Sequence, residues 1–245
     1  MGSPSLPDRG PFRIRARVLT PLDDGGWLDS PDAVVDVDAD GRIRAVREAR
    51  GGAGVNAADA DGADAPGRLF DVRPRALLPG LIDLHAHLPQ LPNAGLGHGL
   101  DLLTWLERYI FPLEHDWADP AVAARLAPAA FGAFAAAGTT TVLAYGAVYE
   151  ESMDAAFAAA EAHGIRAILG KVMMDRVTYD ERRAPGADLL ELSLRQSADL
   201  CARWHGRDGG RLRYAFTPRF AVSCSAELLR ASAALAAETG AHWQT

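Results

Sequence analysis

The chain begins with short stretches in which apolar and polar side chains alternate. Residues 12–19, FRIRARVL, keep a period of two, which is typical of a strand with one buried face. Residues 33–48 contain two further alternating runs joined at Asp40-Gly41, a turn-forming dipeptide, and they predict a hairpin. Residues 51–67 are rich in Gly, Ala and Asp and are expected to form a loop. Residues 1–70 are therefore predicted to be a small β-rich region.

Beyond residue 70 the pattern changes to apolar strands that alternate with helical segments. Strands are predicted at 75–87, 139–148, 166–174, 212–220 and, as a beginning only, 241–245; helices are predicted at 101–111, 119–138, 152–164, 188–204 and 225–239. The clearest helix start is Asp119-Pro120, an N-cap residue followed by a proline at the first helical position. This alternation predicts an α/β fold with a parallel sheet covered by helices.

Alternation alone leaves a closed (β/α)8 barrel and an open doubly wound sheet as alternatives, because both place ligands at the carboxyl ends of their strands. His85, His87 and Arg219 fall at such ends, which favours the barrel. Five strands do not close an eight-stranded barrel. We therefore expect the 245 residues to be an N-terminal fragment, with a barrel part at 71–245 that runs from strand one to the start of strand five.

Composition narrows the classes of function. The chain is 49% hydrophobic and 23% charged, as in ordinary globular proteins, and its formal charge of −7 argues against a nucleic-acid partner. The uncharged stretch from Leu126 to Tyr149 is long enough to span a membrane, but Pro128, Gly132 and Gly138 divide it into a predicted helix and strand. The beginning of the chain lacks an apolar signal region, so we expect a cytoplasmic protein.

Two of the seven histidines stand two positions apart at the end of the apolar run LLPGLIDLHAH, residues 77–87. On a strand, Asp83, His85 and His87 share one face, so both imidazoles could donate a nitrogen to one zinc-like ion. Without a metal, two neighbouring buried imidazoles would each need a separate hydrogen-bond partner, which is costly. The pair therefore predicts a metal site.

The same run resembles the first barrel strand of the amidohydrolase superfamily, whose pattern ends in His-x-His. Within that superfamily, five segments in order are similar to the guanine deaminase family: HLPQ, DLLTWLERYIFPLEH, GTTT, GKVMMD and FTPRFAVSCS. The resemblance covers nearly the whole chain. It implies a (β/α)8 TIM-type barrel preceded by a small β-sandwich-like region at 1–70, which returning C-terminal strands would complete.

The resemblance also implies a hydrolase with one zinc ion per subunit, held by His85 and His87 and by a histidine and an aspartate on later strands. The proton-transferring glutamate and histidine are expected beyond Thr245, so the fragment alone is expected to be inactive. A bridged pair of metals is not favoured, because the fourth strand offers Arg219 rather than a lysine and Lys171 lies on the third. Imidazole and carboxylate ligands leave iron open as an alternative to zinc.

The resemblance to the guanine deaminase family implies that three residues recognise the substrate: Gln90, Arg219 and Phe220. Gln90 offers a donor and an acceptor, the planar fork of Arg219 matches the O6/N7 edge of guanine, and Phe220 could line or stack on a flat ring. The implied reaction is guanine plus water to xanthine plus ammonia, in purine catabolism and commonly by a homodimer. Two alternatives stay open: another aminated heterocycle, such as an oxidised purine, pterin or triazine, or a non-catalytic truncated product that serves in binding or assembly.

The remaining chemistry-bearing residues are expected to be structural. Trp105, Tyr109 and Phe111 are assigned to the core, although the resemblance implies that their segment shapes the rim of the pocket. Glu114 and His115 are assigned to a surface loop, and His242 is interpreted as a structural strand residue. Cys201 and Cys224 show neither a disulfide framework nor a metal-binding spacing, and they are expected to be inert.

Overall fold

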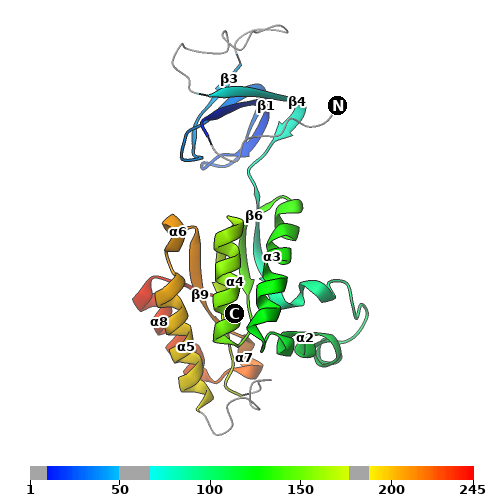
Figure 1. Ribbon diagram of the computed structural model, residues 1–245, viewed down its shortest axis with the longest axis vertical. Helices are drawn as coiled ribbons and strands as arrows, with labels where there is room; N and C mark the ends of the chain where they lie inside the picture. Colours follow the sequence, from blue (N-terminus) through cyan, green and yellow to red (C-terminus); the bar gives the residue numbers. More distant parts are fainter. Residues whose placement is uncertain (1–9, 50–66, 177–187) are drawn as a thin grey trace. The chain divides into compact units, whose positions relative to one another are not determined.

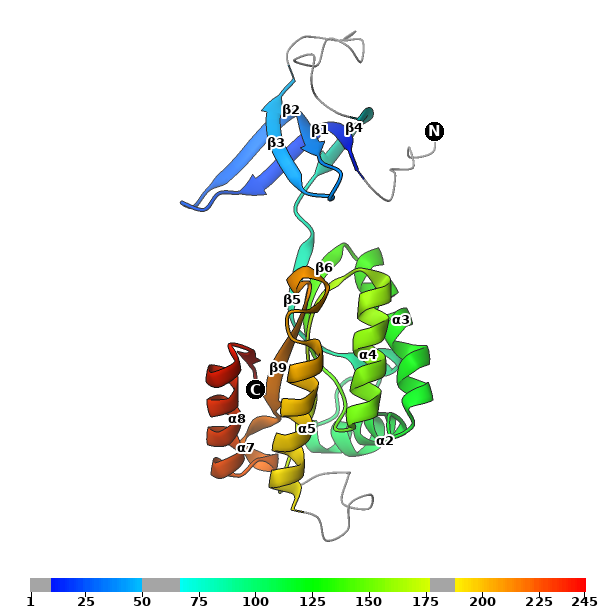
Figure 2. The ribbon, with the colours of Figure 1, turned by 60° about the vertical axis from the view of Figure 1, so that its left-hand side comes forward.

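The computed structural model describes residues 10–49, 67–176 and 188–245, and these form two compact units that divide between Pro79 and Gly80 (Figures 1 and 2). The predicted loop at 51–67 lies outside the described residues except for Gly67. The alternation predicted from the sequence is confirmed, since the first unit is a β-sheet and the second alternates strands and helices. No helix in the described parts of the chain is long and apolar enough to cross a membrane.

The first unit is a four-stranded sheet in the order β3-β2-β1-β4. Its strands are β1 (Phe12–Pro21), β2 (Trp27–Val37), β3 (Ile43–Glu48) and β4 (Arg68–Leu77). The predicted hairpin is present, because β2 and β3 pair antiparallel and Gly41 takes a φ of 76° in the turn between them. Val18, Ala33 and Val35 form a small apolar cluster in this sheet.

An ion-pair network joins three strands of the first unit. The Arg15 guanidinium donates Nε to Asp32 Oδ1 at 2.7 Å and Nη2 to Asp32 Oδ2 at 2.6 Å. Arg73 on β4 reaches the same carboxylate at 3.2 Å and also pairs with Asp71. Arg15 is almost completely buried, so Asp32 compensates a charge that has little access to water.

The second unit is a six-stranded parallel sheet in which the path β10-β9-β7-β6-β5 is joined by β8, paired to β9. Its strands are β5 (Leu81–His87), β6 (Thr139–Tyr145), β7 (Arg166–Gly170), β8 (Val172–Met173), β9 (Leu212–Pro218) and β10 (His242–Trp243). Its helices are η1 (Leu88–Asn93), α1 (Leu102–Trp105), the π-helical η2 (Leu106–Ile110), α2 (Phe111–Asp116), α3 (Pro120–Ala136), α4 (Glu150–His163), α5 (Leu189–Trp204), α6 (Arg207–Gly210), α7 (Phe220–Ser223) and α8 (Ala226–Thr239).

Local chemistry explains where the long helices begin and end. The side chain of Asp119 caps α3 by accepting from Ala121 N, and Ser225 caps α8 by accepting from Leu228 N. Gly164 and Gly240 follow α4 and α8 with positive φ values, as helix-terminating glycines do. The uncharged stretch that begins at Leu126 is therefore the end of α3 followed by β6, as predicted.

The predicted strand 166–174 is divided at Lys171 into β7 and β8, and two further strand predictions need correction. The run 75–87 is two strands, because β4 ends at Leu77 and β5 begins at Leu81; Pro79 lacks the amide hydrogen that would continue a ladder. The predicted strand 212–220 ends at Pro218, so Arg219 follows β9 and Phe220 begins α7. Both changes concern residues that surround the candidate site.

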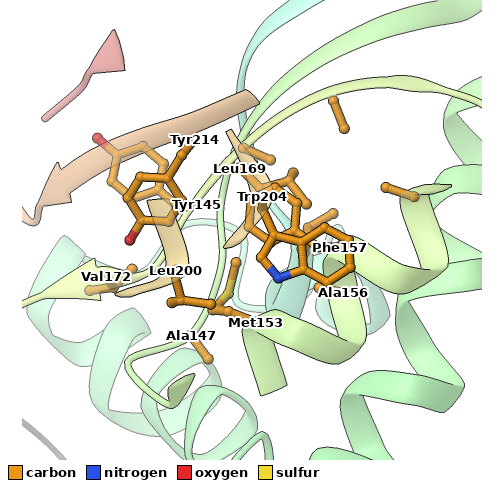
Figure 3. Close-up of a cluster of buried hydrophobic side chains, with 14 of the residues drawn as sticks. Tyr145, Ala147, Met153, Ala156, Phe157, Leu169, Val172, Leu200, Trp204 and Tyr214 are labelled. Carbon is orange, nitrogen blue, oxygen red and sulfur yellow. The ribbon is translucent and has the colours of Figure 1, made fainter. Parts of the chain in front are cut away.

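The core of the second unit lies between the sheet and the helices α3, α4, α5 and α8, which share one side of it (Figures 1 and 2). Phe157 of α4 stacks on Trp204 of α5 with ring centroids 5.2 Å apart, and its centroid lies 6.2 Å from that of Tyr214 on β9 (Figure 3). Trp204 Nε1 donates to Asp154 Oδ1 at 2.6 Å, so its polar atom is satisfied.

Truncating Phe157 is expected to destabilise the second unit. Phe157→Ala removes a fully buried ring that contacts two other aromatic rings, and should lower the free energy of unfolding by about 3–5 kcal/mol. Urea denaturation followed by circular dichroism measures the change. Leu96→Ala, at a half-exposed side chain, is the control and should change it by less than about 0.5 kcal/mol. Equal effects of the two variants would contradict the packing argument.

The first unit is expected to lose stability in acid through Asp32. The Arg15 guanidinium holds the pKa of the Asp32 carboxyl below its usual value. A pKa lower in the folded than in the unfolded chain stabilises the fold above the unfolded value, and this stabilisation disappears as the pH falls through the folded value. Asp32→Asn should cost about 1 kcal/mol at pH 7 and flatten the decline toward pH 3.

The measurement is urea unfolding at several pH values, followed by pulsed hydrogen exchange of peptides covering 12–37 at one fixed labelling pH. Asp29→Asn removes the exposed Arg17–Asp29 pair on the same strands and serves as the control with a smaller effect. An unchanged acid profile for Asp32→Asn would refute the assignment.

Candidate active site

The histidine pair lies at the carboxyl end of β5, next to β6. His87 is directly opposite Tyr145 in the parallel register. The ring centroids of His85 and His87 are 5.2 Å apart, and the Tyr145 ring stacks on His87 at 4.4 Å with an angle of 10° between the planes. Asp83 turns back to accept the backbone N–H of His85 at 3.0 Å. The two imidazoles therefore share one face, as the strand pattern requires.

The environment of His87 keeps its ring neutral. Burial, the positive charge of Arg219 and the neighbouring His85 lower the pKa of His87 to about 3. A neutral imidazole is the form that binds a metal ion. Nδ1 of His87 lies 3.0 Å from Gln90 Nε2, whereas its Nε2 has no partner among the described residues.

Glu114 connects the residues around this pair. Its side chain is completely buried in α2, where Oε1 accepts from Gln90 Nε2 at 2.8 Å and Oε2 accepts from Arg219 Nη1 at 2.5 Å. Gln90 comes from η1 and Arg219 from the residue after β9, so one carboxylate joins three separate segments. The guanidinium of Arg219 also lies 5.7 Å above the Phe111 ring.

The assignment of Glu114 to a surface loop is wrong. Pro112 does not interrupt the segment but stands in the first turn of α2, where a proline is tolerated. Ile110, Glu114 and Trp117, at helical spacing, are all at most 1% exposed. The signal was present in the sequence, because Leu106, Ile110 and Trp117 define an apolar helical face that includes position 114. His115, by contrast, is exposed as predicted.

The structure brings the sequence-predicted site residues to one cavity. His85, His87, Gln90, Arg219 and Phe220 all line a cavity of about 450 Å³. Leu102, Trp105, Leu106, Tyr145 and Thr245 complete the lining. Trp105, expected in the core, is half-buried at this cavity and donates Nε1 to Leu96 O at 3.0 Å. An apolar wall with a few convergent polar groups is the usual form of a small-molecule site.

Arg219 and Phe220, which follow β9, differ in their exposure to solvent. Arg219 is almost fully buried, and its backbone N–H donates to Met173 O at 3.0 Å. Phe220 is 38% exposed and takes a φ of 39°, a left-handed conformation that side chains other than glycine rarely adopt. Such strain at a cavity wall indicates that the backbone is bent to place these two side chains.

The donor set agrees with part of a metal site. Among the described residues no three His, Cys, Asp or Glu side chains lie close enough together to hold one ion. His85 and His87 nevertheless supply two adjacent imidazoles, one of them held neutral by its surroundings, and imidazole nitrogen is a preferred zinc ligand. His98, at an exposed turn, and His242, on β10, line no part of this cavity.

Comparison with known proteins identifies the class. The Amidohydrolase family model matches residues 76–245, and the chain belongs to this family, whose members are generally metal-dependent. The chain is 39% identical over 176 residues to guanine deaminase of Escherichia coli (strain K12), covering 72% of this chain and 38% of that protein. It is 41% identical over 170 residues to a probable guanine deaminase of Deinococcus radiodurans, covering 69% and 37%.

Comparison with solved structures gives the same family. The solved structure of Escherichia coli guanine deaminase matches with a TM-score of 0.79 at 31% identity, over 95% of this chain and 52% of that chain. The sheet and its helices are therefore a partial amidohydrolase TIM barrel, preceded by a small N-terminal β-sheet. The chain spans less than two fifths of the length of the two curated relatives.

Both cysteines are expected to resist thiol reagents in the folded chain. Burial and the nearby Asp175 raise the pKa of the Cys224 thiol from about 9 to about 11, and burial raises the pKa of Cys201. At pH 8 the Cys224 shift lowers its thiolate fraction about 100-fold. Ellman's reagent should therefore react slowly with the native chain and quickly after urea denaturation. Rapid labelling of two thiols in the native chain would contradict this.

Proposed function

We propose that this chain carries the substrate-recognition residues and two metal ligands of a guanine deaminase, which converts guanine and water to xanthine and ammonia. One observation carries the proposal: Arg219 and Gln90 are fixed by the same carboxylate on the cavity that also contains the histidine pair. The two curated relatives, both named guanine deaminase or probable guanine deaminase, support the same substrate.

Recognition of guanine follows from the chemistry of the cavity wall. Arg219 presents a planar fork of donors, which matches the two acceptors O6 and N7 of the purine. A substrate without such acceptors would leave the guanidinium unpaired at a cost of about 1–3 kcal/mol, which disfavours a triazine. Phe220, partly exposed at the cavity, offers a flat ring for stacking. This arrangement would leave the 2-amino group of guanine toward His85 and His87.

We propose zinc as the metal, with His85 and His87 as two of its ligands. Bound zinc lowers the pKa of water toward about 7 and so provides the hydroxide for hydrolysis at neutral pH. Tyr145 holds the His87 ring by stacking and excludes water from one face of it. Cytoplasmic purine catabolism by a homodimer is part of the same proposal.

Zinc-dependent ammonia release from guanine is the first expected outcome. The complete product of the gene that carries this sequence, loaded with zinc, should release ammonia from guanine but not from adenine or cytosine. Arg219→Met should lower kcat/KM for guanine by about 10- to 100-fold, the loss of a charged hydrogen bond. No release by a folded, zinc-loaded protein would refute guanine as the substrate and leave the family assignment in place.

The metal ligands are tested in the same preparation by zinc content. His87→Ala should lower the bound zinc per subunit, whereas His98→Ala, an exposed histidine away from the cavity, should leave it at the wild-type value. Equal zinc contents in the two variants would contradict the proposed ligand.

A further inference from the structure

Glu114 is a buried carboxylate whose partners are themselves candidate recognition residues. It is completely buried, and each of its oxygens accepts from a different segment: Oε1 from Gln90 and Oε2 from Arg219. A buried charge is expensive unless it is paired and hydrogen-bonded. The two contacts meet that requirement, and they do so at the wall of the cavity rather than in the core.

These contacts determine which atoms of Gln90 face a ligand. A carboxylate accepts hydrogen bonds and does not donate them, so the amide group that meets Glu114 must be the NH2. The same NH2 lies 3.0 Å from His87 Nδ1. The contact with Glu114 alone therefore sets the orientation of the amide, and the carbonyl oxygen Oε1 of Gln90 has no partner among the described residues. Gln90 therefore offers an acceptor to the cavity.

Arg219 is oriented in a complementary way. Its Nη1 is occupied by Glu114, whereas no protein acceptor within the described ranges meets Nη2 or Nε. The backbone N–H of Arg219, bonded to Met173 O, anchors the other end of the residue. The cavity wall thus presents free donors from Arg219 and a free acceptor from Gln90, both set by one carboxylate.

We propose that Glu114 is a positioning residue that determines purine specificity by fixing this donor and acceptor pattern. The inference rests on the proposed function, because it concerns the same cavity. An oxopurine has ring acceptors for Arg219 and an N–H for the Gln90 oxygen, so it matches the pattern. Adenine would place its 6-amino donor group against the donors of Arg219. With the carboxylate removed, the Gln90 amide is free to turn over and Arg219 loses its anchor.

The test uses Glu114→Gln, which keeps the side-chain shape and removes the charge, and Glu114→Asp, which keeps the charge on a shorter side chain. Asp116→Asn is the matched control, because it removes an exposed carboxylate from the same helix. Steady-state kinetics with guanine is measured on the zinc-loaded complete gene product. Binding of hypoxanthine and adenine is measured alongside, by quenching of the tryptophan fluorescence to which Trp105 at the cavity contributes.

The expected result is a change in binding selectivity. Glu114→Gln should raise the KM for guanine and weaken hypoxanthine binding by about 10- to 100-fold, with a smaller change in kcat. Adenine binding should change by less than about threefold, so discrimination between the two bases falls. Glu114→Asp should recover part of the loss, and Asp116→Asn should match the wild type.

A purely structural ion pair predicts a different outcome. It would lower thermal stability and weaken all ligands alike, and that result, or an unchanged KM in folded Glu114→Gln, overturns the proposal. Wild-type protein that binds neither hypoxanthine nor guanine overturns it as well. If the wild type fails to deaminate guanine but still binds hypoxanthine in a Glu114-dependent way, the proposed reaction is wrong and the specificity role of Glu114 stands.

Discussion

The contact between Glu114 and Arg219 joins parts of the chain that are 105 residues apart. It ties helix α2 to the end of β9, and through Gln90 it also holds the 3₁₀ segment that follows the histidine strand. Removing two opposite charges from water costs free energy, and the attraction between them repays it only with good geometry and further hydrogen bonds. Here the Gln90 amide and the Phe111 ring provide those additional contacts. The cavity wall owes its arrangement to this paired charge.

Stability and site chemistry are separated along the strands of the second unit. The stacked rings of Phe157 and Trp204 fill the layer between sheet and helices, whereas the histidines and Arg219 stand where strands end. The strands β7 and β9 also approach each other closely at Gly170. A Cβ atom on Gly170, at the end of β7, would lie 2.1 Å from Ala215 O on β9, so only glycine permits this spacing. Tyr145 belongs to both regions, because it lines the cavity and is also part of the buried core.

The sequence predicted most of the fold because its signals are local. Asp119 and Ser225 mark helix starts by their own capping chemistry, and the strand pattern alone placed His85 and His87 on one face. The roles expected for Gln90, Arg219 and Phe220 came from family resemblance, since neither period nor spacing distinguishes them from structural residues. Glu114 was missed because a proline two positions earlier was read as a loop signal. Its true partners lie on other elements, and only the tertiary fold brings them together.

The cavity has two chemically different sides, and Gln90 belongs to both. On one side its amide nitrogen lies against His87, a candidate metal ligand whose ring is held by Tyr145; on the other it bonds to Glu114 and, through it, to Arg219. The amide group of Gln90 thus contacts the imidazole of His87 directly and the guanidinium of Arg219 through Glu114. Because the Glu114 carboxylate can only accept hydrogen bonds, it holds the amide nitrogen of Gln90 and leaves the amide oxygen turned away from it. Gln90 therefore lies between the histidine pair and the Glu114–Arg219 pair and contacts a member of each.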